Sequence, residues 1–174
     1  YFYKTLHFFA PDLTLMRSLF YYPIFVAALS VLFVFLIARK IAGTLGGFFA
    51  GLMMAINAAF LGRTLFGHAD SDAWVVFFPL LITWLFTASI GTKSITKIVV
   101  MTLVGGLSTA MYSYAWTGWW YIFDFLLVTT ATTFGYLVFS NFAEIRRNFR
   151  FLISNTAIRN MVIFGLLYFL STAI

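Results

Sequence analysis

The sequence predicts an all-α fold, a polytopic bundle of membrane-spanning helices with almost no water-soluble body. Of its 174 residues, 63% are hydrophobic and only 9% are charged, whereas a soluble domain carries about 25% charged residues. The apolar residues also lie in continuous runs and do not alternate with polar ones as they do in β-barrel strands. So few charged residues cannot form a water-facing surface, and we therefore expect most of the chain to lie in lipid.

The apolar runs predict about six membrane spans, because a helix needs roughly 20 apolar residues to cross the bilayer core. Five runs meet or nearly meet that length, and a sixth begins at Met161. The five are Leu19–Ala38, Ile41–Leu61, Ala73–Ile90, Ile98–Ala115 and Trp119–Phe139. Since the chain starts at Tyr1 and stops inside an apolar run, we expect residues 1–174 to be a partial transmembrane domain, truncated at both ends and without a soluble domain.

The basic residues predict how the chain lies in the membrane. Eight of the eleven fall on one side of the expected spans and three on the other. Because cytoplasmic loops are enriched in Lys and Arg, the eight-residue side is expected to be cytoplasmic. The eight are Arg39, Lys40, Lys93, Lys97, Arg146, Arg147, Arg150 and Arg159, and the three are Lys4, Arg17 and Arg63. The sequence thus predicts a multi-pass protein of the cell membrane whose Gly62–Asp72 loop is extracytoplasmic.

The net charge of +6 does not indicate a nucleic-acid partner, because the basic residues are scattered between apolar runs. Loop charges of a membrane protein explain them better. The chain contains no cysteine, which excludes a disulfide framework and any thiolate metal site.

Small residues recur every four positions in the second expected span, at Gly43, Gly47, Gly51, Ala55 and Ala59. Such a stripe lets a second helix approach closely. We expect Gly43, Gly47 and Gly51 to be buried against another helix, either as a specific helix pair or as ordinary tight packing in a bundle.

The stretch Phe142–Ile153 has a different pattern, in which apolar residues share one helical face and arginines lie largely off it. This pattern suits a helix that lies on the cytoplasmic membrane surface and contacts anionic lipid. A basic cytoplasmic loop is the alternative. The apolar residues are Phe142, Ile145, Phe149, Leu152 and Ile153, and the arginines are Arg146, Arg147 and Arg150.

The acidic residues Asp12, Asp70, Asp72 and Asp124 all fall on or near the outward side of the expected spans. The triplet Asp70-Ser71-Asp72 is the most informative, because two carboxylates on a turn at the membrane surface suit Mg²⁺ or Mn²⁺. Asp72 also precedes the third span, and the alternative interpretation is that it serves only as the N-cap of that helix.

Neighbouring residues favour a functional site. Arg63 precedes Asp70 by seven residues and could bind a phosphate or a carboxylate, or simply mark the membrane boundary. His68 is also close to the two acids in the sequence, but a lone histidine in a loop is more often solvated than a metal ligand. Asp124 lies inside the fifth expected span, where an ionisable group is a functional candidate, although its role stays open.

The ten residues from Arg63 to Asp72, RTLFGHADSD, resemble the second acidic motif of the oligosaccharyltransferase catalytic subunit. The following VVFFPLLITWLF and the later YSYAWTGWWYIFD are also similar to that family, and the chain as a whole looks archaeal. Family members usually have an aromatic residue before the first acid, where this chain has Ala69, and His68 also replaces a commonly aromatic position. Neither change removes a carboxylate.

The resemblance implies a larger multi-span glycosyltransferase of the GT-C type. Such enzymes transfer an oligosaccharide from a dolichyl phosphate or pyrophosphate carrier to the Asn of Asn-x-Ser/Thr, which is protein N-glycosylation. It implies that Asp70 and Asp72 hold Mn²⁺ or Mg²⁺ and that Arg63 lies in the active site. The implied partners are the lipid-linked oligosaccharide, an acceptor polypeptide and membrane lipid. Other motifs of the family are missing from residues 1–174, so we expect this segment alone to be inactive.

Two other classes of protein fit this sequence less well. Another lipid-carrier glycosyltransferase, such as a protein O-mannosyltransferase, usually has its acidic pair in the first long outer loop, and here the pair follows the second expected span. A transporter module tends to carry charges near the bilayer midplane, whereas these spans are nearly uncharged.

Overall fold

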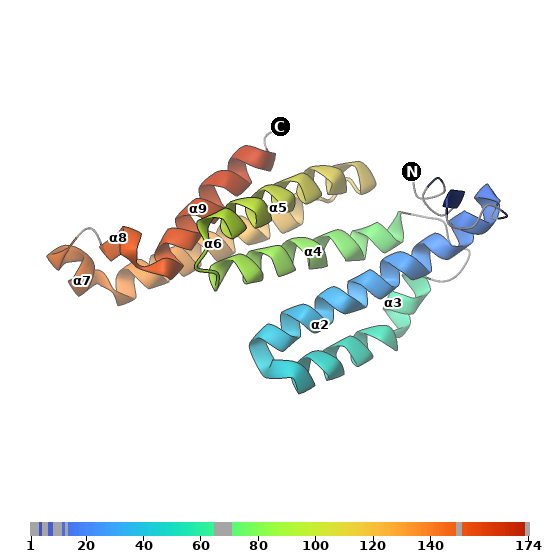
Figure 1. Ribbon diagram of the computed structural model, residues 1–174, viewed down its shortest axis with the longest axis horizontal. Coiled ribbons are helices and arrows are strands. Elements are labelled where there is room, and N and C mark those ends of the chain that lie inside the picture. Colours follow the sequence, from blue (N-terminus) through green and yellow to red (C-terminus); the bar gives the residue numbers. More distant parts are fainter. Residues whose placement is uncertain are drawn as a thin grey trace. The chain divides into compact units, whose positions relative to one another are not determined.

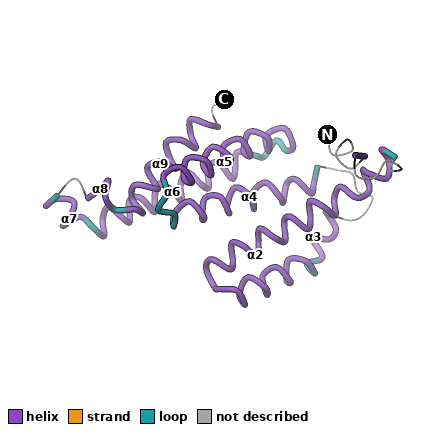
Figure 2. The backbone as a smooth tube through the Cα atoms, viewed as in Figure 1, coloured by secondary structure: helices purple, strands orange, loops and turns teal. Residues whose placement is uncertain are grey.

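The computed structural model describes residues 4, 7–8, 12, 14–64, 71–148 and 151–172. Every regular element in these ranges is α-helical (Figure 2). Four helices there are long and apolar enough to cross a membrane, which confirms the predicted class. These are α2 (Leu15–Ala55), α4 (Asp72–Ile90), α5 (Ile95–Ala115) and α6 (Trp120–Ser140). The shorter helices are α3 (Ala58–Arg63), α7 (Phe142–Arg147), α8 (Phe151–Ser154) and the apolar α9 (Thr156–Thr172).

The chain forms two compact units, residues 1–80 and residues 81–174, and the boundary falls inside α4. In the first unit, α2 has 41 residues and would be about 60 Å long if straight, twice the roughly 30 Å core of a bilayer. Gly43 resolves this excess length. Its φ of 75° and ψ of −176° are non-helical, and α2 doubles back there into a hairpin of two arms (Figure 1). The hairpin contains the first expected span and residues 41–55 of the second.

The small-residue stripe packs the two arms of this hairpin against each other. Gly47 and Gly51 are buried, and a Cβ built on Gly47 would lie 2.8 Å from the carbonyl oxygen of Phe35 in the first arm. The prediction of burial is therefore confirmed for these two glycines. It is wrong for Gly43, which is exposed. Gly43 is needed for the turn, because a positive φ is readily adopted only by glycine.

Aromatic side chains join the first arm of α2 to the first half of α4. The ring centroids of Tyr22 and Trp74 are 5.5 Å apart, and those of Phe33 and Phe77 are 5.7 Å apart. Edge-on and tilted pairs at these separations add attraction beyond the burial of their area. Val26 of the same arm is 1% exposed. These contacts fix the beginning of α4 relative to α2.

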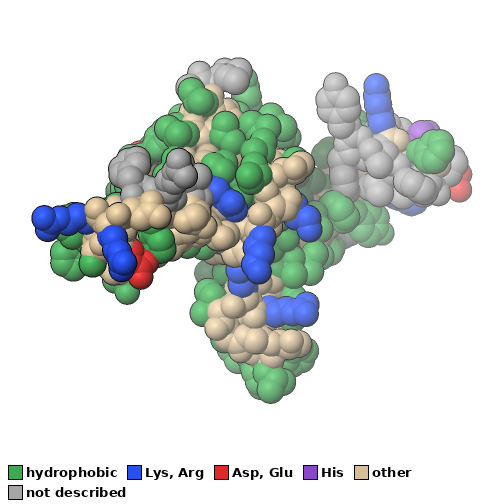
Figure 3. Space-filling view, turned by 60° about the vertical axis from the view of Figure 1, so that its left-hand side comes forward, with side chains coloured by type: hydrophobic (Ala, Val, Ile, Leu, Met, Phe, Trp, Pro, Cys, Tyr) green, Lys and Arg blue, Asp and Glu red, His purple; other side chains and the backbone are tan. Residues whose placement is uncertain are grey.

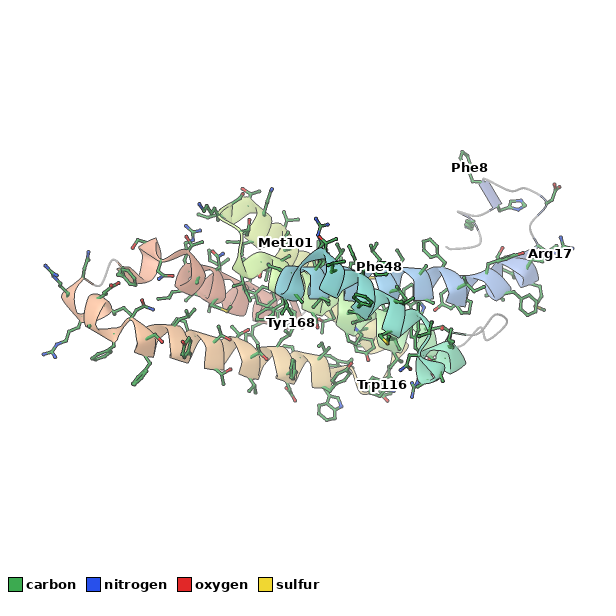
Figure 4. All side chains as sticks on the ribbon, turned by 90° about the horizontal axis from the view of Figure 1, so that it is seen from below. Phe8, Arg17, Phe48, Met101, Trp116 and Tyr168 are labelled. Carbon is green, nitrogen blue, oxygen red and sulfur yellow. The ribbon has the colours of Figure 1, made fainter. Side chains whose placement is uncertain are left out.

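In the second unit, α9 packs along α5 at two adjacent glycines. A Cβ on Gly105 would lie 3.9 Å from the Tyr168 ring, and a Cβ on Gly106 would clash with Ser171. The close approach brings Thr109 Oγ1 to 2.7 Å from Tyr168 Oη, and both side chains are buried. Tyr168 is labelled in Figure 4. A hydrogen bond satisfies two hydroxyl groups that would otherwise be costly inside an apolar bundle.

Asn160 of α9 ties this helix to the end of α4. Its side chain is 1% exposed, and Nδ2 donates to the carbonyl oxygens of Ser89, Ile90 and Thr92 at 3.0, 3.0 and 2.8 Å. The last carbonyls of a helix have no partner within the helix, so a buried amide from another helix satisfies them. Next to it, Arg159 Nη2 lies 3.4 Å from the carbonyl oxygen of Lys93.

Large apolar side chains cover much of the outside of the helices (Figure 3). In α6, whose residues are all described, only Ile122 and Leu126 are buried, while Phe125 and Val128 are 63% and 58% exposed. A soluble protein rarely exposes such continuous apolar area. This surface is suited to contact with lipid or with further helices.

The expected surface helix over Phe142–Ile153 is wrong as a continuous element. The structure has the six-residue α7 and the four-residue α8 there, and Asn148 after α7 is extended, with φ −147° and ψ 101°. Of the side chains of α7, Ile145 is half-buried and the others are exposed. Asn148 ends α7 because its backbone leaves the helical region.

Candidate active site

The expected second span, Ile41–Leu61, is not one helix, and the difference places Arg63. The second arm of α2 ends at Ala55, and α3 begins after Asn57. Arg63 is the last residue of α3. A cation is favoured there, because the carbonyl end of a helix carries a partial negative charge.

Asp72 begins α4 at the opposite kind of helix end. The preceding residue, Ser71, occupies the N-cap position, because its carbonyl oxygen accepts from the backbone N–H of Val75 at 3.2 Å. Asp72 therefore lies in the first turn, where the partial positive charge of the helix favours a carboxylate. The sequence-based alternative in which Asp72 is the N-cap residue differs from this geometry by one position.

Arg63 and Asp72 approach each other across these two helix ends. Arg63 Nη1 lies 4.0 Å from Asp72 Oδ2, and the two side chains are 54% and 47% exposed. A half-exposed ion pair at this distance contributes little to stability. Both groups therefore stay accessible, the guanidinium to a phosphate and the carboxylate to a cation.

Asp70, the other predicted metal ligand, and His68 lie outside the described residues. Within the described ranges, no group of three or more His, Cys, Asp or Glu side chains is placed to hold a metal ion. Asp72 itself suits one, because its carboxylate supplies hard oxygen donors of the kind that Mg²⁺ and Mn²⁺ prefer. Its partial exposure also leaves room for water ligands, which Mg²⁺ usually retains.

Asp124 lies one turn into α6 and is exposed. In the described part of its own unit, no basic side chain forms an ion pair with it. It therefore stays a functional candidate by position alone.

Comparison with known proteins identifies the family. The family model for oligosaccharyl transferase STT3, N-terminal, matches residues 1–173. The chain belongs to the STT3 family. This confirms the resemblance seen in the motif from Arg63 to Asp72, and the match extends over nearly the whole chain. With the four membrane-length helices, it makes the chain part of a multi-pass membrane protein.

A named relative agrees with this STT3 assignment. The chain is similar to a dolichyl-phosphooligosaccharide-protein glycotransferase of Methanococcus voltae, with 24% identity over 122 residues. That alignment covers 68% of this chain and 13% of the relative. No solved structure matches the chain.

The sequence analysis did not single out Asn57, which separates the second arm of α2 from α3. Asn57 lies inside the apolar run that was expected to be a single span, and the structure breaks the run there. The available signal was its residue type, because asparagine favours helix N-caps and is unfavourable inside a helix.

Proposed function

We propose that the full-length protein containing this chain transfers an oligosaccharide from a dolichyl phosphate or pyrophosphate carrier to the Asn side chain of Asn-x-Ser/Thr. The STT3 match over residues 1–173 carries the proposal. The meeting of Arg63 with Asp72 supports it, because the two ends of the sequence motif, nine positions apart, lie within 4.0 Å of each other.

In this reaction the bond between the anomeric carbon and the phosphate oxygen breaks, and a bond from that carbon to the amide nitrogen forms with inversion. The nitrogen loses one proton, and the carrier leaves as a phosphate or pyrophosphate. Asp72, together with Asp70, would hold Mn²⁺ or Mg²⁺, which when bound offsets negative charge on the leaving phosphate. Arg63 would keep the Asp72 carboxylate oriented and add positive charge at the same end of α4.

The proposed activity is tested with purified full-length protein, lipid-linked oligosaccharide and a fluorescent peptide that contains Asn-x-Thr. We expect glycosylated peptide in the presence of Mn²⁺ or Mg²⁺ and none with a Gln-x-Thr peptide. Sugar attached to the Thr of the Gln-x-Thr peptide would instead indicate an O-mannosyltransferase-like enzyme. Solute uptake by reconstituted vesicles, without any transfer, would indicate a transporter.

The proposed site also requires the beginning of α4 to face outside the cell. Ser71 directly precedes this 19-residue helix, and Ser94 follows it and caps α5. A 19-residue helix is about 28 Å long, so the two serines flank one membrane span. In an otherwise cysteine-free full-length protein, we expect Ser71→Cys to react with an impermeant maleimide in intact cells. Ser94→Cys should react only after permeabilisation, and labelling of both from the same side contradicts the topology.

A further inference from the structure

The break between α2 and α3 is built around Asn57. Asn57 has φ −68° and ψ 121°, which is extended backbone, and it follows a normal helix end in which Ile56 N–H donates to the Leu52 carbonyl oxygen at 3.1 Å. Its Oδ1 accepts from Phe60 N–H at 3.0 Å, and its carbonyl oxygen accepts from Leu61 N–H at 2.9 Å. Asn57 therefore ends one helix and starts the next in a new direction.

The short helix that follows is anchored in place. Phe60 and Thr64 are 6% and 5% exposed. Thr64 Oγ1 donates to the Phe60 carbonyl oxygen at 2.8 Å, and Thr64 N–H donates to the Leu61 carbonyl oxygen at 3.1 Å. With six residues, α3 is far too short to persist by itself. Its direction is therefore fixed by the cap at its start and by the two buried side chains.

The direction of α3 decides where Arg63 lies. If residues 56 and 57 were helical, the second arm of α2 would continue, and each following residue would take a place on that longer helix. The extended backbone of Asn57 redirects the chain instead. Arg63 then comes to within 4.0 Å of Asp72 at the start of α4.

We propose that Asn57 is a positioning residue for the glycosyl-transfer site, which acts by holding α3 so that the guanidinium of Arg63 meets the carboxylate of Asp72. The inference rests on the proposed function for the role of that pair. Asn57 itself does not contact the pair, and its side-chain bond is made to the Phe60 backbone.

The cap is tested in the full-length protein by removing or keeping the acceptor oxygen. Loss of an Asn N-cap costs a factor of roughly 2 to 30 in the local helix equilibrium, so we expect Asn57→Ala to lower the transfer rate by up to that factor. Asn57→Asp and Asn57→Ser keep a capping oxygen and should stay near the wild-type rate. As a matched control, Ser94→Ala removes the N-cap of α5 and should leave transfer unchanged.

A double-mutant cycle separates positioning from a general loss of stability. If Asn57 acts through Arg63, Asn57→Ala should have no further effect on transfer in the Arg63→Ala background. A full additional loss in that background would overturn the proposal, and so would a wild-type rate in Asn57→Ala.

A geometric measurement keeps the inference distinct from the proposed function. In the cysteine-free protein, the Arg63→Cys/Asp72→Cys double variant should be joined by a short bismaleimide reagent. Adding Asn57→Ala should slow this reaction by up to the same factor, and adding Asn57→Asp should leave its rate unchanged. Slower cross-linking, combined with no glycosyl transfer by the full-length protein that keeps Arg63 and Asp72, would contradict only the proposed function. Unchanged cross-linking would contradict the positioning role.

Discussion

Asp72→Asn is expected to lower glycan transfer by the full-length protein by at least a hundredfold, the scale seen when one charge-stabilising group of an active site is lost. The amide has the shape of the carboxylate but lacks its charge, so it is a poor metal ligand and no longer pairs with Arg63. The loss at the start of α4 is only about 0.3–1 kcal/mol of helix-dipole stabilisation. Expression and folding should therefore stay normal while transfer falls.

Companion variants sharpen this test. Asp70→Ala and Asp72→Ala should each lower transfer as strongly, whereas Glu144→Gln, at an exposed acid of α7, should not. Partial recovery of Asp72→Asn at high Mn²⁺ would support a metal ligand. Full activity of Asp72→Asn would mean that Asp72 serves only the start of α4, and the metal-site proposal would be lost.

Gly47→Leu is expected to give the largest effect on stability. A Cβ at this position would already lie 2.8 Å from Phe35 O and 2.9 Å from Arg39 Cβ, so the rest of the leucine must push the two arms of α2 apart. Overpacking of this kind typically costs about 1–3 kcal/mol. The thermal unfolding midpoint of the purified protein in detergent should fall by several degrees.

The control for this variant is Gly135→Leu in α6, where a Cβ would meet nothing within 4 Å. Leucine is a better helix former than glycine, so this change should leave the midpoint unchanged or raise it. If Gly47→Leu also left the midpoint unchanged, the packing of the hairpin at Gly47 would be incorrect.

Part of the candidate site was accessible from the sequence. The spacing from Arg63 to Asp72 and the outward position of the acids indicated it, and the structure brings these two residues to within 4.0 Å of each other. The break at Asn57 was not predicted, because Ile41–Leu61 is apolar enough to be interpreted as one span. The mean hydropathy of such a run changes little when it contains one N-cap residue. The link from Asn160 to the end of α4 was missed for a related reason, since its three acceptors lie 68 to 71 positions away in the sequence.

The sequence by itself determined the membrane class, the approximate positions of the long apolar helices, and the motif that marks the family. These properties depend on the average hydropathy of neighbouring residues or on short sequence spacings. The hydropathy of a membrane protein is informative because a segment that crosses the bilayer must satisfy its own backbone hydrogen bonds, which favours long apolar helices. Only the tertiary structure decided which glycine turns and which glycines pack. Gly43, Gly47 and Gly51 are equivalent in a four-residue repeat, but one has a φ of 75° and the other two face the first arm of α2. That difference depends on backbone angles and on contacts with residues earlier in the chain, and composition and periodicity contain neither.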